Sequence, residues 1–216
     1  KVRVRLADRP EYGLHGLDEG EIQVKSPHTH VGYYKNPKKT KEAWLEGGWY
    51  STGDLGRMDE HGKVHILERI SAVRVLKDKT IVFPGKLMTI LEESKYASQV
   101  LVDADKSQTI LGCVVVVDRT ALEDFCRERE AAGGGGHVSR AEVLDSKEFK
   151  TEVIASFRRI NGAKDLHVDK IGVVVFTEEP WTTKNRLLTG SHKKRVNEIR
   201  KMFAAQLEDA YAKYEG

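Results

Sequence analysis

Cysteines and long apolar segments are scarce in this sequence. It has only two cysteines, and it contains no apolar run long enough to cross a membrane as a helix. The shortage of cysteine argues against a small secreted domain held together by disulfides, so we expect Cys113 and Cys126 to be core residues in a reducing compartment. This favours an intracellular protein, either cytosolic or peripheral on an organelle membrane.

A dominant charge is also missing. The chain carries 36 Lys and Arg against 33 Asp and Glu, and the lysines are scattered. This balance argues against nucleic-acid binding, which usually requires a basic face. Lys35, Lys38, Lys39 and Lys41 could touch anionic lipid headgroups, but a solvated helix is the simpler interpretation. The histidines show no metal-ligand spacing, so we expect no metal site built by this chain.

What the sequence does contain is a change of pattern near Ala72, which predicts an α+β fold in two parts. Residues 1–69 alternate short apolar stretches with Gly and Pro turns, which is typical of strands. The strands are expected at 2–6, 21–25, 49–52 and 63–67. One short helix should interrupt them, because Asn36 can cap it and Pro37 suits its first position.

The second part, residues 73–216, mixes helical and strand patterns. We expect a hairpin over 72–76 and 80–83, and a helix that Pro84 begins. Three short β-branched runs predict sheet strands at 99–102, 110–117 and 171–176. Further helices are expected at 121–130, 145–160 and 196–212. Asp145 and Glu148 have the spacing of a capping box at the start of the second of these.

The segment GWYSTGDLG at 48–56 is the most informative one for function. It fixes one carboxylate, Asp54, at the end of an aromatic-rich strand, and Gly53 lets the backbone bend closely around a ligand. A rigid carboxylate of this kind suits the two hydroxyls of a ribose. Arg69, one strand later, is placed to point its planar donor group at the same ligand. Asp54 could also be a simple turn residue, and Arg69 could instead pair with Glu68 or Asp59.

Several ordered segments resemble the carboxy-terminal third of an adenylate-forming enzyme, most closely a eukaryotic-type long-chain acyl-CoA synthetase. They are GEIQV at 20–24, GYYKNP at 32–37, TKEA at 40–43, GWYSTGDLG at 48–56, PWT at 180–182, LLT at 187–189 and KKR at 193–195. The resemblance implies that residues 1–69 end a large AMP-binding domain with a distorted β-barrel. Residues 70–72 would form a hinge at Ala72, and residues 73–216 a small mobile α+β domain with a three-stranded sheet.

The resemblance also implies a two-step reaction. A fatty acid carboxylate attacks the α-phosphate of ATP, which gives acyl-AMP and pyrophosphate, and the thiol of CoA then displaces AMP. Thr52, Gly53, Asp54 and Arg69 would bind the nucleotide. Lys193 would bridge the carboxylate and the α-phosphate, a task that suits a compact cation on a flexible stem. The competing interpretation of Lys193 is a solvated basic cluster with Lys194 and Arg195.

Other segments of that family are missing from this chain. It has neither the Ser/Thr-Gly-rich loop that wraps the triphosphate nor the Tyr-Gly-x-Thr-Glu segment that supplies the carboxylate linked to Mg²⁺. The chain also begins at Lys1 within a predicted strand. We therefore expect a piece of a longer protein, inactive by itself, with Mg²⁺ bound by the upstream domain.

The sequence departs from the family pattern at four places. The usual glycine-bearing turn before Pro84 is replaced by Lys-Asp-Lys-Thr at 77–80. Residues 70–72 read Ile-Ser-Ala where basic and polar residues are usual, Arg186 stands where a turn glycine is common, and His192 precedes the key lysine. If position 186 needs a positive φ, the arginine there costs about 1 kcal/mol. The departures at 70–72 and Arg186, together with the start within a predicted strand, support an alternative, a non-catalytic or truncated relative with a structural role in a larger assembly.

Overall fold

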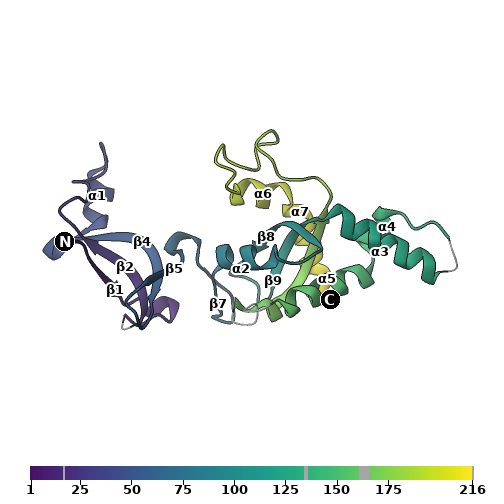
Figure 1. Cartoon of the computed structure of the whole chain (residues 1–216), viewed down its shortest axis with the longest axis horizontal. Helices are drawn as coiled ribbons and strands as arrows, with labels where there is room; N and C mark the ends of the chain where they lie inside the picture. Colours follow the sequence, from purple (N-terminus) through teal and green to yellow (C-terminus); the bar gives the residue numbers. More distant parts are fainter. Residues whose placement is uncertain (17, 134–135, 161–165, 216) are drawn as a thin grey trace. The chain divides into compact units, whose positions relative to one another are not determined.

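The computed structural model describes residues 1–16, 18–133, 136–160 and 166–215. The chain forms two compact units, Lys1–Val73 and Arg74–Gly216 (Figure 1). Both contain strands and helices, so the predicted α+β fold class is confirmed. The functional identity assigned to residues 1–69, 70–72 and 73–216 stays a prediction. None of the described helices is long and apolar enough to cross a membrane.

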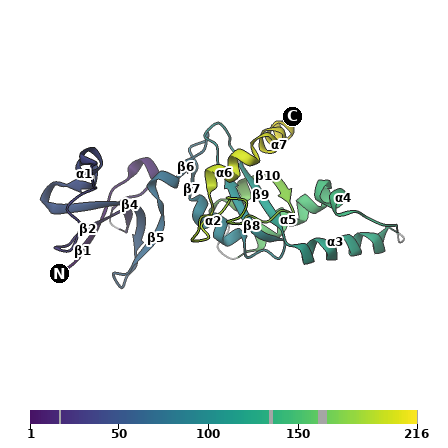
Figure 2. The ribbon, with the colours of Figure 1, turned by 90° about the horizontal axis from the view of Figure 1, so that it is seen from above.

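The first unit is a curled, half-barrel antiparallel sheet. Its order is β1-β2-β4-β3, and β5 also pairs with β4 (Figure 2). The strands are β1 (Arg3–Ala7), β2 (Glu19–Lys25), β3 (Trp44–Leu45), β4 (Trp49–Met58) and β5 (Val64–Arg69). The helical segments are η1 (Pro10–Tyr12), α1 (Pro37–Ala43), η2 (Glu46–Gly48) and η3 (Ile70–Ala72). As predicted, Asn36 caps α1, accepting a hydrogen bond from the N–H of Lys39, and Pro37 begins the helix.

The second unit is built on a three-stranded sheet in the order β10-β9-β8, which confirms the prediction of three strands. The pair β8/β9 is antiparallel and the pair β9/β10 is parallel. The strands are β6 (Arg74–Val75), β7 (Ile81–Val82), β8 (Ala97–Asp103), β9 (Leu111–Val117) and β10 (Ile171–Thr177). The helices are α2 (Pro84–Leu91), α3 (Arg119–Ala132), α4 (Arg140–Asp145), α5 (Lys147–Arg159), η5 (Val168–Lys170), α6 (Val196–Met202) and α7 (Ala204–Glu215).

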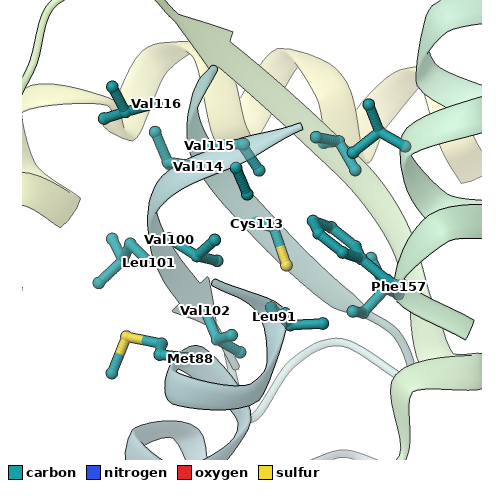
Figure 3. Packing of buried hydrophobic residues seen from close by; sticks show 14 of the residues in the cluster. Met88, Leu91, Val100, Leu101, Val102, Cys113, Val114, Val115, Val116 and Phe157 are labelled. Carbon is teal, nitrogen blue, oxygen red and sulfur yellow. The ribbon is translucent and has the colours of Figure 1, made fainter. Parts of the chain in front are cut away.

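The core of this unit lies on both faces of its sheet. Val102 pairs with Cys113 across β8 and β9, so both side chains point to one face, and Figure 3 shows Cys113 pointing towards Phe157 of α5. On the other face α7 lies close to Gly112, because a Cβ there would meet the Tyr211 hydroxyl at 2.6 Å. The two cysteines are free and buried, as predicted.

One predicted helix cap and one predicted helix were wrong, whereas the helix expected at 145–160 is present as α5. The capping box forms between Ser139 and Glu142 at the start of α4, not between Asp145 and Glu148. Helix α5 then begins separately, because the Ser146 hydroxyl accepts the N–H of Phe149. A short serine hydroxyl reaches the free backbone N–H groups of a helix start well, so each serine begins its own helix.

The helix predicted at 196–212 is instead two helices, α6 and α7. Phe203 separates them, because its backbone leaves helical geometry (φ −103°, ψ 12°). Its side chain is buried in the core of the second unit.

Candidate functional site

The Thr-Gly-Asp motif forms a bulge in β4. Ser51 and Leu55 pair with Gln23 and Glu21 of β2, so three residues of β4 lie opposite the single residue Ile22. We call residues 52–54 the Asp54 bulge. Gly53 is in the left-handed region at φ +72°, which glycine adopts without steric cost. The predicted end of the strand at Thr52 was therefore wrong, because β4 absorbs the extra residues and continues to Met58.

Thr52 holds the Asp54 bulge to the neighbouring strand. Its hydroxyl donates to the carbonyl oxygen of Ile22 at 2.7 Å and accepts the backbone N–H of Asp54 at 3.1 Å. One side chain thus connects the first residue of the bulge to both β2 and the last residue of the bulge. The Asp54 backbone is fixed by this contact rather than free as in a surface turn.

Asp54 and Arg69 meet as cross-strand partners on β4 and β5. Arg69 Nε lies 2.8 Å from Asp54 Oδ1, and its Nη1 donates to the carbonyl oxygen of Thr52 at 3.0 Å. The Asp54 side chain is 22% exposed and that of Arg69 is 64% exposed, so the pair faces solvent. Of the alternative partners, Asp59 instead contacts His65 at 2.8 Å. This contact helps to lower the pKa of Asp59.

An aromatic group lies near this pair. The Tyr50 hydroxyl is 2.8 Å from that of Tyr33, and the His30 ring meets both tyrosine rings edge to face. The Tyr33 hydrogen bond and burial raise the pKa of Tyr50, while Arg69 and Asp54 act on it with opposite signs. Tyr50 therefore stays a neutral hydrogen-bonding group beside the ion pair at ordinary pH.

Lys193 lies on a tight turn of the second unit, residues 189–193. The N–H of Thr189 donates to the carbonyl oxygen of Lys193 at 2.8 Å, and the Thr189 hydroxyl accepts the N–H of Lys193 at 3.1 Å. His192 adopts φ +59° to close the turn. Lys193 is exposed, and it makes no ion pair with any residue that the structure describes.

The other basic residues of this cluster have different surroundings. The Lys194 side chain is 20% exposed, and its amine pairs with the carboxylate of Glu92. The same Glu92 oxygen accepts the N–H of Val100 at 2.8 Å, so this pair ties the segment to β8. The backbone N–H of Arg195 donates to Leu187. Within the Lys-Lys-Arg cluster, Lys193 is therefore the lysine whose amine is available to a ligand.

The turn that carries Lys193 is anchored through Trp181. The Trp181 side chain is buried, and its backbone N–H donates to Gln99 Oε1 at 2.7 Å, while Gln99 Nε2 donates back to its carbonyl oxygen at 3.1 Å. Arg186, between the anchor and the turn, has φ +62°. Position 186 therefore has a backbone conformation that favours glycine, in agreement with the turn glycine that is common there in the family that the sequence resembles.

The predicted nucleotide residues Thr52, Gly53, Asp54 and Arg69 come together in the first unit. Ala72, the predicted hinge residue, ends the single turn of η3. The sequence interpretation missed the buried Glu21, whose carboxylate contacts Ser51 and Gly53. The available signal was a Glu and a Gln alternating with Ile and Val in one predicted strand. Among the described residues, no cluster of three or more His, Cys, Asp or Glu side chains could hold a metal ion.

Comparison with known proteins gives relatives that align with almost the whole chain. Fatty acyl-CoA synthetase A of Dictyostelium discoideum is 30% identical over 98% of this chain and 32% of its own length. Long-chain-fatty-acid–CoA ligase 1 of Cavia porcellus is 29% identical over 97% of this chain and 30% of its own. The homologues of this chain are long-chain fatty-acid–CoA ligases. The resemblance inferred from the sequence is thereby confirmed.

This ligase-like chain corresponds to the carboxy-terminal part of those proteins and spans about a third of their length. No family model matches it. Among solved structures, the adenylation domain of a carboxylate reductase from Mycobacterium chelonae has a TM-score of 0.76 and 25% identity, over 97% of this chain and 31% of its own. The A domain of the Segniliparus rugosus carboxylic acid reductase, at 24% identity and a TM-score of 0.80, covers 98% of this chain and 31% of its own, and shows the same fold.

Proposed function

We propose that this chain is the carboxy-terminal part of a long-chain fatty acid–CoA ligase. The complete protein would join a fatty acid to ATP, releasing pyrophosphate, and then exchange the AMP of the acyl-adenylate for the thiol of CoA. The observation that carries the proposal is the alignment of 98% of the chain with a fatty acyl-CoA synthetase. ATP, Mg²⁺, the fatty acid and CoA are the expected ligands, with Mg²⁺ bound outside this chain. We place the ligase inside the cell, in the cytosol or on the surface of an organelle.

In this proposal Asp54 and Arg69 bind the ribose of ATP. A carboxylate offers two acceptor oxygens, which match two neighbouring hydroxyl donors. Arg69 is oriented by its contacts with Asp54 and the Thr52 carbonyl, so it enters the site preorganised. Thr52 and Gly53 contribute by shaping the Asp54 bulge rather than by charge.

Lys193 would act in the first step. Negative charge moves from the fatty acid carboxylate and the α-phosphate towards pyrophosphate, and a cation between them stabilises that transition state. The exposed amine of Lys193, without an ion-pair partner in the described part of the chain, is available for this role. Lys194 is not, because Glu92 already holds it.

Residues 70–72 would form the hinge at which the second unit rotates after the first step and before the second. The single turn of η3 lies between Arg69 (ψ 133°) and Val73 (ψ 140°), both extended. A rotation at Ala72 needs changes at only a few backbone angles there. Such a rotation would withdraw Lys193 once the adenylate has formed and make room for CoA.

The proposal is tested on the full-length protein and on these 216 residues separately. The full-length protein should release pyrophosphate only when a long-chain fatty acid is present, and should form a thioester when CoA is added. The 216 residues alone should neither saturate with ATP at millimolar concentration in a calorimetric titration nor release pyrophosphate. A full-length protein without either half-reaction, or turnover by the 216 residues alone, contradicts this assignment.

The competing proposal is a non-catalytic relative with a structural role in a larger assembly. One observation favours it. Arg186, before the turn that carries Lys193, and His192, within that turn, both have left-handed backbone conformations, which strain residues other than glycine. The same pyrophosphate assay separates the two proposals. A folded full-length protein that binds ATP but never releases pyrophosphate would favour the structural role.

A further inference from the structure

We propose that Glu21 is a positioning residue that sets the Asp54 bulge and thereby the selectivity of the site for the ribose of ATP. The inference rests on the proposed function, and it adds a residue that does not itself touch the nucleotide. The burial of Glu21 is unusual. The Glu21 side chain is 0% exposed, whereas acidic side chains are rarely buried without dedicated partners.

The partners of Glu21 come from two directions. On one side the Arg9 guanidinium pairs with Oε2. On the other side Oε1 accepts the Ser51 hydroxyl, and the backbone N–H of Gly53 lies 3.4 Å from the same oxygen. Ser51 directly precedes the Asp54 bulge and Gly53 is its middle residue. The carboxylate therefore connects Arg9 to the backbone that carries Asp54.

This arrangement gives the bulge a fixed shape. The Thr52 hydroxyl binds the Ile22 carbonyl oxygen, while Glu21, the preceding residue of β2, binds Ser51 and Gly53. Each of the three consecutive residues from Ser51 to Gly53 is thus held by a contact with β2. A buried carboxylate that lost these donors would be left unsatisfied, so the bulge is constrained to keep them. The direction of the Asp54 side chain follows from this backbone.

Gln23 provides a matched control on the same strand. It is also buried, and it also pairs with an arginine, because its Oε1 accepts Arg5 Nε at 2.8 Å. Its position two residues after Glu21 places both side chains on the same face of β2. No hydrogen bond runs from the Gln23 side chain to the described residues of the Asp54 bulge. If the buried polar residues of β2 had only a structural role, substitutions at Glu21 and at Gln23 should affect the nucleotide preference in the same way.

The experiment measures the preference of the full-length ligase for ATP over 2′,3′-dideoxy-ATP, as the ratio of the two kcat/KM values for acyl-adenylate formation. Asp54→Ala should reduce this preference about ten- to a hundredfold, on the scale of a hydrogen bond to a charged group. Glu21→Gln should reduce it about three- to tenfold, mainly through the KM for ATP, because the carboxylate that orients the bulge is altered but Asp54 remains. Gln23→Ala should keep the preference, even if its melting temperature falls.

Two controls separate the possible failures. If Glu21→Gln does not fold, Ser51→Ala removes one of the two contacts between Glu21 and the bulge region and should reduce the preference in the same direction. A folded Glu21→Gln protein, or in its absence Ser51→Ala, with the wild-type preference overturns the positioning role while the proposed function stands. If Asp54→Ala also keeps the wild-type preference, the ribose contact itself is wrong and the proposed site fails with it.

Discussion

Lys193 and Lys194 are neighbours with the same chemistry, yet the structure gives them different surroundings, and this allows catalysis and stability to be separated. Lys193 is exposed and makes no ion pair within the described residues. Lys193→Ala should therefore change the free energy of unfolding by no more than about 0.5 kcal/mol. If the full-length protein is the ligase proposed above, Lys193→Ala should slow acyl-adenylate formation about a thousandfold or more, which corresponds to a loss of about 4 kcal/mol of transition-state stabilisation.

Lys194→Ala should do the opposite. The Lys194 side chain is 20% exposed and that of its partner Glu92 is 28% exposed, so the pair is intermediate between a surface and a buried salt bridge. Removing it leaves a partly buried carboxylate that still accepts the N–H of Val100. A loss of about 1–2 kcal/mol follows, or roughly 2–8 °C in melting temperature for a domain of this size. The rate of acyl-adenylate formation should fall less than about threefold, because Glu92 holds the Lys194 amine away from the reaction. On the scale of the barrier this is small, since a tenfold change corresponds to about 1.4 kcal/mol.

The two half-reactions provide the assay. Acyl-adenylate formation is measured by pyrophosphate release, and the second step by thioester formation from preformed acyl-AMP. Lys193→Ala should impair only the first, because a cation that bridges two charges of the first transition state has no task in the second. Equal losses in both steps would refute the reasoning, as would a Lys194→Ala protein that loses adenylation while its melting temperature is unchanged.

Three further predictions concern single positions. Asp54→Ala should raise the KM for ATP about ten- to a hundredfold, whereas Asp59→Ala, which removes an acid paired with His65 on the same hairpin, should leave this KM unchanged in the same steady-state assay. Arg186→Gly should stabilise the protein by about 1 kcal/mol in urea unfolding, because glycine adopts φ +62° without strain; a destabilised variant would mean that the arginine makes a compensating contact. The Ser107 N–H and hydroxyl, with Arg200, hold the pKa of Asp105 at about 2, below its usual value, so this carboxylate stabilises the fold above about pH 4 and loses that effect as the pH falls towards 2. Thermal melts between pH 5 and 2 should accordingly show a shallower decline for Asp105→Asn than for the wild type.

Much of the fold was predictable because its signals are local. The capping of α1 by Asn36 depends on residues three positions apart, and the three strands of the second unit are short β-branched runs that a sheet buries well. The features that were missed depend on competition between caps or on tertiary packing. Ser146 rather than Asp145 caps α5, and Phe203 interrupts the predicted last helix at a residue buried in the core.

The candidate site was predictable to a smaller extent. The motif around Asp54 predicted that Asp54 and Arg69 face the same ligand, and the structure brings the two side chains together, but their ion pair was not itself predicted. The bulge could not be predicted, because the register that creates it belongs to β2, far away in the sequence. The role of Glu21 depends on the same register, since its burial follows from which strands lie beside it.

The anchoring of Trp181 has a consequence for how the charge of Lys193 can be moved. Gln99 ties Trp181 to β8 by two hydrogen bonds, and the turn of residues 189–193 is closed by its own backbone. These hydrogen bonds tie the segment that carries Lys193 to the three-stranded sheet, whereas the exposed Lys193 side chain has a flexible stem. If the second unit rotates at the hinge proposed above, Lys193 would move with the sheet, and its withdrawal from the nucleotide would depend on the rotation of the unit rather than on a local rearrangement.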